Sequence, residues 1–126
     1  MTIDVRRVYD PPDPGDGTRV LVDRLWPRGL SKEDARLDEW CKDVAPSAEL
    51  RTWFHHDQEA RFEEFERRYR AELDDNPAVA RLAEQGSGQR RLTLLYAIRD
   101  TEQNHALVLR DVLVDYLEAA GSTSAD

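Results

Sequence analysis

One short stretch of the sequence concentrates side chains that could bind a ligand. Asp23, Arg24, Trp26 and Arg28 fall within six residues, directly after an apolar run. A guanidinium presents a planar set of donors that matches the two oxygens of a carboxylate or a phosphate group. An indole can pack against a ligand, and a carboxylate can orient a ligand or exchange a proton with it. We therefore expect this stretch to bind a small anion, with Asp23 as a candidate catalytic residue.

A second group of candidate residues follows another apolar run. Tyr96 lies near the end of this run, Arg99 and Asp100 come next, and His105 falls in the first turn of a predicted helix. We expect the first three residues to contact the ligand. The positive end of a helix dipole favours the neutral imidazole of His105, which can accept or donate a proton. His105 would share catalysis with Asp23 if the protein is an enzyme, which the sequence leaves open.

The same charged residues also have a structural interpretation. Asp23 could pair with Arg99, or Asp100 with Arg24, so that an internal network of ion pairs closes the crevice. Charges beside core strands need such partners, because a buried unpaired charge is costly. The protein would then be a non-catalytic structural module, or a module that binds a protein partner. The residue types are compatible with both interpretations.

Two apolar runs must position these side chains. Residues 20–25 and 92–98 are rich in Val, Leu and Ile, which is typical of strands buried in a parallel sheet. The sequence between them has mainly helical patterns, and ligands of open α/β sheets bind outside the carboxyl ends of the strands. We therefore predict a small α/β fold with a mostly parallel central sheet flanked by helices. The two runs should be adjacent strands whose ends share one pocket.

Shorter patterns predict the remaining connections. Residues 3–9 alternate between apolar and polar types, which predicts a half-exposed strand near an edge of the sheet. Residues 10–17 contain three prolines and two glycines, which predicts a surface loop without regular structure. Residues 37–45 alternate again, and this pattern favours a short strand.

Helical spacing predicts which aromatic residues form the core. Phe62, Phe65 and Tyr69 recur at intervals of three and four residues in a highly charged segment, which predicts one buried stripe on a helix. We expect a single α/β domain over residues 1–121. The polar segment 122–126 is predicted to be a flexible C-terminal tail.

Composition limits the class of protein and its partners. The chain has 126 residues and a formal net charge of −8, which disfavours nucleic-acid binding. It has no apolar run long enough to span a membrane and no apolar segment typical of a secretory signal near its start. Cys41 is the only cysteine, so we expect a reducing cytoplasm and no intrachain disulfide. The expected partner is a small anionic ligand, and the sequence does not indicate an oligomeric state.

No pattern indicates a metal or a cofactor. His55 and His56 are adjacent, and neighbouring residues on a helix point about 100° apart, so the two rings do not readily share one ion. The sequence contains neither a His-x3-His nor a Cys-x2-Cys pair, and no glycine-rich loop stands between a strand and a helix. We therefore expect no metal site and no bound cofactor.

Four segments of the sequence resemble the YeaO-like family of small bacterial proteins. They are the string Asp-Arg-Leu-Trp-Pro-Arg-Gly at residues 23–29, together with residues 45–56, 62–69 and 94–106. The first string is specific, and the similarity extends over most of the chain. The resemblance implies a compact cytoplasmic α/β domain. It implies no established activity, cofactor or catalytic residue.

Overall fold

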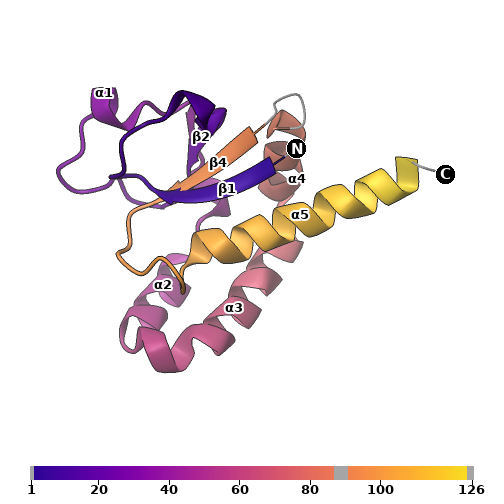
Figure 1. Cartoon of the computed structure of the whole chain (residues 1–126). Coiled ribbons are helices and arrows are strands. Elements are labelled where there is room, and N and C mark those ends of the chain that lie inside the picture. The colour runs from indigo at the N-terminus through magenta and orange to yellow at the C-terminus, as the bar shows by residue number, and fades with distance from the viewer. Residues whose placement is uncertain (1, 87–90, 125–126) are drawn as a thin grey trace.

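The computed structural model describes residues 2–86 and 91–124 (Figure 1). The four strands are β1 (Thr2–Arg7), β2 (Thr18–Leu21), β3 (Glu39–Trp40) and β4 (Arg91–Tyr96). The α-helices are α1 (Lys32–Ala35), α2 (Ala48–His55), α3 (Gln58–Asp74), α4 (Pro77–Gly86) and α5 (His105–Ser124). Two short 3-10 helices, η1 (Pro14–Asp16) and η2 (Lys42–Val44), lie in the connections.

The strands form one parallel sheet in the order β1-β4-β2-β3. The predicted small α/β fold is therefore confirmed, with β2 and β4 adjacent at its centre and β1 at one edge. The predicted ends of both central strands are wrong, because β2 ends at Leu21 and β4 at Tyr96. The Val22 N–H still donates to the Leu95 carbonyl, at 3.0 Å, and the chain then leaves the sheet at Asp23.

Alternation along the central strands divides their side chains between two cores. Val20 and Val22 face the larger core, whereas Leu21 between them faces a smaller one. Leu94 faces the larger core and Leu95 the smaller one in the same way. Both faces of the central strands are therefore buried, which explains why the sequence runs are apolar throughout.

Helices cover one face of the sheet and loops cover the other. Helices α2, α3, α4 and α5 all contribute buried side chains to the larger core, and Figure 1 shows α3 and α5 crossing below the strands. The smaller core packs against partly buried residues from loops and from β3, which are Trp26, Leu30, Leu37, Trp40 and Ala97. The loop face therefore contains the Asp23–Arg28 segment that the sequence predicts to bind a ligand.

The stripe on α3 lies in the larger core, as predicted. Phe65 is 1% exposed, Tyr69 is fully buried, and Phe62 packs at the margin of the core. The helix begins after Asp57, whose carboxylate accepts a hydrogen bond from the Ala60 N–H. The buried Tyr69 hydroxyl donates to the Val44 carbonyl, which ties α3 to η2.

Two connections and the C-terminal segment differ from the sequence-based expectations. The segment 10–17 contains the 3-10 helix η1, because Asp13 caps it by accepting a hydrogen bond from the Gly15 N–H. The segment 37–45 forms only the two residues of β3 before turning into η2. Helix α5 continues to Ser124, so residues 122–124 of the predicted flexible tail are helical, and the last two residues lie outside the described ranges.

A buried ion-pair network holds η1 against the sheet. Asp16 is 3% exposed and pairs with Arg6, at 2.7 Å, and with the buried Arg19. The Asp16 carbonyl accepts a hydrogen bond of 2.7 Å from the Thr93 hydroxyl in β4. Gly17 follows with a φ of +66°, and a Cβ atom there would lie 2.1 Å from the Arg91 carbonyl oxygen. The network therefore joins the 10–17 connection to β1, β2 and β4.

Candidate functional site

A pocket of about 370 Å³ lies at the carboxyl ends of β2 and β4. The loop after β2 forms one wall, and helices α2, α3 and α5 contribute the others. This is the edge of a parallel sheet at which ligands usually bind. The residues that line the pocket are Tyr9, Asp23, Arg24, Leu25, Trp26, Pro27, Arg28, Ala45, Pro46, Arg51, Phe54, His55, Phe65, Ala97, Ile98 and His105.

The pocket brings together five of the eight site residues that the sequence predicts. The loop after β2 supplies four of them and the first turn of α5 supplies the fifth. These five residues are Asp23, Arg24, Trp26, Arg28 and His105.

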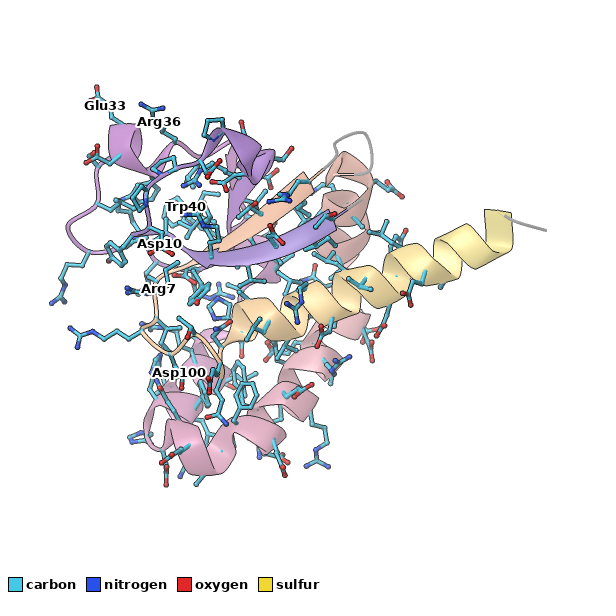
Figure 2. The ribbon with its side chains drawn as sticks, in the orientation of Figure 1. Arg7, Asp10, Glu33, Arg36, Trp40 and Asp100 are labelled. Carbon is cyan, nitrogen blue, oxygen red and sulfur yellow. The ribbon has the colours of Figure 1, made fainter. Side chains whose placement is uncertain are left out.

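The other three predicted residues lie outside the pocket, at the end of β4 and in the loop that leads to α5. Tyr96 is 3% exposed in the larger core, where burial raises the pKa of its phenol. Arg99 is exposed to solvent. Asp100, labelled in Figure 2, accepts hydrogen bonds from the backbone N–H groups of Glu102 and Gln103, which hold its pKa below the usual value. Asp100 therefore shapes the turn before α5.

Asp23 and His105 form a pair at the base of the pocket. Asp23 Oδ2 accepts a hydrogen bond of 2.9 Å from the Ala97 N–H, which joins the loop after β2 to the chain after β4. Asp23 Oδ1 lies 2.8 Å from His105 Nε2. The same ring nitrogen lies 3.2 Å from the Val22 carbonyl oxygen. The carboxylate thus has a histidine partner, and the predicted pairs of Asp23 with Arg99 and of Asp100 with Arg24 do not form among the described residues.

The surroundings of His105 determine which nitrogen carries the proton. Both oxygens near Nε2 are acceptors, so an unprotonated Nε2 would place three lone pairs against one another. We therefore assign a proton to Nε2. The N–H points more nearly at the Val22 carbonyl, so the buried Asp23 Oδ1 is close to the ring without an aligned hydrogen bond. This arrangement anchors the start of α5 to the end of β2.

Three arginines surround the pocket without an acidic partner. Arg24 donates a hydrogen bond of 3.2 Å to the Pro46 carbonyl. Arg28 and Arg51 are exposed, and neither guanidinium has a hydrogen bond or an ion pair with any described residue. Asp23 is the only carboxylate that lines the pocket, and His105 already contacts it. A chain of net charge −8 therefore contains a locally positive pocket.

A second histidine, His55, lies beside these cations in the pocket. His55 Nδ1 lies 2.7 Å from Gln58 Nε2, so the amide donates and the ring nitrogen accepts. Partial burial lowers the pKa of His55, and electrostatic interactions with Arg51 and with the imidazole of His105 lower it further. The imidazole is therefore neutral at pH 7, and an anion in the pocket would favour its protonation.

Most of the remaining lining is apolar and closely packed. Phe54 and Phe65 stack with their ring centroids 4.2 Å apart. Trp26 packs edge-on against Trp40, with centroids 5.3 Å apart, and its indole N–H donates to the Leu30 carbonyl. The Trp26 indole therefore fixes the loop that carries Arg24 and Arg28.

The side chains of the lining limit the chemistry of the pocket. None of the lining residues is a serine, threonine, cysteine or lysine, so the pocket has no hydroxyl, thiol or amine nucleophile other than the Tyr9 phenol. Within residues 2–86 and 91–124, no group of three His, Cys, Asp or Glu side chains could hold a metal ion. Guanidinium and imidazole groups suit the recognition of an anion.

Sequence reasoning missed three polar residues of the pocket. Arg51 and His55 are four residues apart on α2, a spacing that places them on one face of the helix. Nothing local in the sequence indicates that this face lies across from the strand ends. Tyr9 follows β1, and the parallel arrangement brings the carboxyl ends of strands to one edge. Because Tyr9 comes directly after a predicted strand, this rule could have placed it among the candidate site residues.

The comparison with protein families decides the classification. Residues 2–126 match the family described as the inactive DUF488-N3 subclade. The chain belongs to this family. The uncharacterised protein YeaO of Escherichia coli K12 is 47% identical over 113 residues, which cover 90% of this chain and 97% of YeaO. The resemblance to the YeaO-like family is therefore confirmed.

Mycobacterial relatives are also similar over most of their length. The uncharacterised protein Rv3073c of Mycobacterium tuberculosis H37Rv is 51% identical over 109 residues, which cover 86% of this chain and 91% of the relative. The uncharacterised protein Mb3100c of Mycobacterium bovis has the same identity and coverage. No solved structure matches the chain. None of the helices in the described ranges is long and apolar enough to cross a membrane.

Proposed function

We propose that this protein binds a small anion, bearing a phosphate or a carboxylate group, in the pocket at the ends of β2 and β4. The observation that carries the proposal is the set of unpaired cations formed by Arg24, Arg28 and Arg51. Like charges that converge without partners repel one another, and an anion held between them removes that repulsion. A guanidinium also binds two oxygens of one anionic group at once.

Contrast with several arginines elsewhere in the chain supports this assignment. On α3, Arg67 and Arg68 both pair with Glu64, and in β4 Arg91 pairs with Asp4 at 2.9 Å. Acidic residues outnumber basic ones by 26 to 18, so partners for an arginine are abundant. The arginines of the pocket lack such partners because the lining excludes every carboxylate except that of Asp23.

We propose binding without turnover. The Nε2–H of His105 is directed at protein oxygens, and the lining offers no strong nucleophile. The family description also contains the word inactive. In this proposal the Asp23–His105 pair holds the strand end and the helix start in place, and the arginines bind the ligand. The single cysteine, which is buried, suits a reducing compartment, and we propose the cytoplasm.

Removal of two pocket arginines tests the proposal. Isothermal titration calorimetry with phosphate, pyrophosphate, sulfate and citrate should detect binding of at least one anion by the parent protein. We expect the double variant Arg28→Ala/Arg51→Ala to bind that anion about 100-fold more weakly or worse, because each charge-assisted hydrogen bond contributes about 1.5–3 kcal/mol. Both side chains are exposed, so the melting temperature without ligand should change little.

A matched variant separates local recognition from a general loss of charge. Arg67→Ala/Arg110→Ala removes two arginines outside the pocket and should bind the anion like the parent. The proposal fails if none of the four anions binds the parent. It also fails if both double variants lose affinity equally, since binding would then depend on net charge alone.

Anion affinity should rise as the pH falls. His55 has a lowered pKa in the empty pocket, and it faces Arg51 on its own helix, Gln58 of α3 and His105 of α5. A bound anion stabilises the protonated ring, so lowering the pH protonates His55 and strengthens binding. Sulfate is a suitable probe because its charge is constant over this range. We expect its affinity to increase roughly fivefold or more from about pH 7.5 to about pH 5.5.

The variant His55→Gln should lose most of this pH dependence. Glutamine keeps a polar side chain of similar reach and has no proton to gain in this range. Calorimetry at both pH values would compare the two proteins. An equally steep dependence in His55→Gln would assign the proton uptake to His105 or to another group.

A further inference from the structure

We propose that the anionic group belongs to an aromatic phosphate ester, such as a nucleoside 5′-monophosphate, whose ring lies between Tyr9 and Leu25. This inference rests on the proposed function, because it assigns the phosphate to the same arginines. It adds the chemical class of the remainder of the ligand.

Exposed apolar side chains of the described chain gather at this pocket. Leu25 is 59% exposed and Tyr9 is 40% exposed, and they are the large hydrophobic residues that remain exposed in the described ranges. Both line the pocket that contains Arg24, Arg28 and Arg51. Exposed apolar surface beside a pocket is a frequent sign of a site that contacts an apolar group. A bare oxyanion would leave both side chains in water.

Tyr9 is held in place as a platform for stacking. Its hydroxyl donates a hydrogen bond of 2.8 Å to the Arg28 carbonyl, and the Arg7 guanidinium lies 5.1 Å from its ring centroid. A ring that is already fixed loses little conformational entropy when a ligand stacks on it. The hydrogen bond also links the ring to the loop that carries the Arg28 guanidinium. The stacking surface and the anion-binding group are therefore positioned together.

The size and polarity of the pocket fit such a ligand. Its volume of about 370 Å³ falls within the range of small-molecule pockets, which is about 300–1,000 Å³. The lining includes cationic side chains and also apolar surface from Pro27, Phe54 and Ile98. A ligand with one charged end and one flat apolar end would use both kinds of side chain.

A comparison of matched phosphates tests the inference. Calorimetry would measure the four nucleoside 5′-monophosphates and phenyl phosphate against ribose 5-phosphate, which has the phosphate without an aromatic ring, and adenosine, which has the ring without the phosphate. We expect at least one aromatic phosphate to bind about tenfold more tightly than ribose 5-phosphate, as stacking on one aromatic side chain provides. Adenosine should bind more weakly than its monophosphate.

Variants of Leu25 and Tyr9 should remove only the part of the affinity that the aromatic ring of the ligand contributes. Leu25→Ser should reduce the preference for the aromatic phosphate to about threefold or less and leave the affinity for ribose 5-phosphate unchanged. Tyr9→Ala should reduce the preference to the same extent when it is compared with Tyr9→Phe, which also lacks the hydrogen bond to the Arg28 carbonyl. Tyr9→Phe keeps the ring and should keep most of the preference. Leu25 is mostly exposed and makes no hydrogen bond through its side chain, so its substitution should leave the stability of the fold nearly unchanged.

The outcomes separate this inference from the proposed function. If ribose 5-phosphate binds the parent as tightly as every aromatic phosphate, the aromatic inference is overturned and anion binding stands. If Leu25→Ser and Tyr9→Ala both keep the full preference, the assigned position of the ring is wrong. If none of these phosphates binds, or if adenosine binds as tightly as its monophosphate, the inference fails, and the anion-binding function is decided separately by the titrations with phosphate, pyrophosphate, sulfate and citrate.

Discussion

Asp16→Asn is expected to lower the free energy of unfolding by about 3–5 kcal/mol, the range for breaking a buried ion pair by removal of one partner. The Asp16 side chain is 4% exposed and that of its partner Arg19 is 6% exposed. Asparagine has nearly the same shape and no charge, so the Arg19 guanidinium would remain buried without a counter-charge. Equilibrium denaturation with urea would measure the loss.

An exposed pair in the same sheet provides the control. Asp4 and Arg91 lie 2.9 Å apart with side chains 39% and 43% exposed, and Asp4→Asn should cost less than about 1 kcal/mol. Adding Arg19→Met to Asp16→Asn should recover part of the loss, since the unpaired charge is then gone. Equal effects of Asp16→Asn and Asp4→Asn would contradict a special role for the buried network.

The pH dependence of the same variant has a defined sign. Burial raises the pKa of Asp16, but hydrogen bonds from the Asp13 N–H, Arg6 and Arg19 outweigh this effect and leave the pKa below its usual value. A carboxyl group with a lowered pKa stabilises the folded state above its unfolded pKa, and this contribution disappears as the pH falls through the folded value. The difference in stability between the parent and Asp16→Asn should therefore shrink in acid, below about pH 4.

Phe65→Ala is the second substitution with a large expected effect. It should destabilise the protein by about 3–5 kcal/mol, as large-to-small changes in a core do. Phe65 is 1% exposed and stacks on Phe54, so the removed ring leaves a cavity behind the pocket wall. The prediction would be falsified if urea denaturation showed a loss below about 1 kcal/mol, which is typical of surface positions.

A neighbouring ring on the same helix provides the comparison. Phe62 is partly exposed at the margin of the core, with its centroid 6.2 Å from that of Phe65. Phe62→Ala should therefore cost clearly less than Phe65→Ala, because less buried surface is lost. A similar cost for both variants would indicate that the margin of the core is as tightly packed as its centre.

The two central strands could be predicted from the sequence because burial on both faces leaves an unbroken apolar run. Their ends could not be predicted, because contacts between distant segments determine them. After β2, for example, the Asp23 carboxylate accepts a hydrogen bond from the Ala97 N–H, which replaces further pairing between the backbones. The position of Tyr96 at a strand end predicts a place in the site, and this prediction is wrong because Tyr96 lies in the larger core. The two-residue period of a strand places it on the same face as Leu92 and Leu94, which is the face of the larger core.

Only those residues of the candidate site that lie close together in the sequence could be predicted. Arg24 and Arg28 belong to the loop after β2, and the sheet rule places that loop at the ligand edge. Arg51 and His55 reach the pocket because α2 packs against α3, and the sequence does not encode that packing in any local pattern. The pairing of Asp23 with His105 has the same origin, since it joins the end of one strand to the start of the last helix.

The position of β4 in the sheet has a consequence for synthesis on the ribosome. This strand is the last of the four in sequence, yet it lies between β1 and β2, and Thr2 pairs with Arg91. Until β4 has been made, β1 lacks its neighbour in the described sheet, and β2 pairs only with the two residues of β3. Such distant pairings must pay loop-closure entropy before their contacts form. We therefore expect the apolar side chains of β1 and β2 to stay without their strand partner until β4 is synthesised. A chain interrupted before residue 91 would lack the strand that joins β1 to β2.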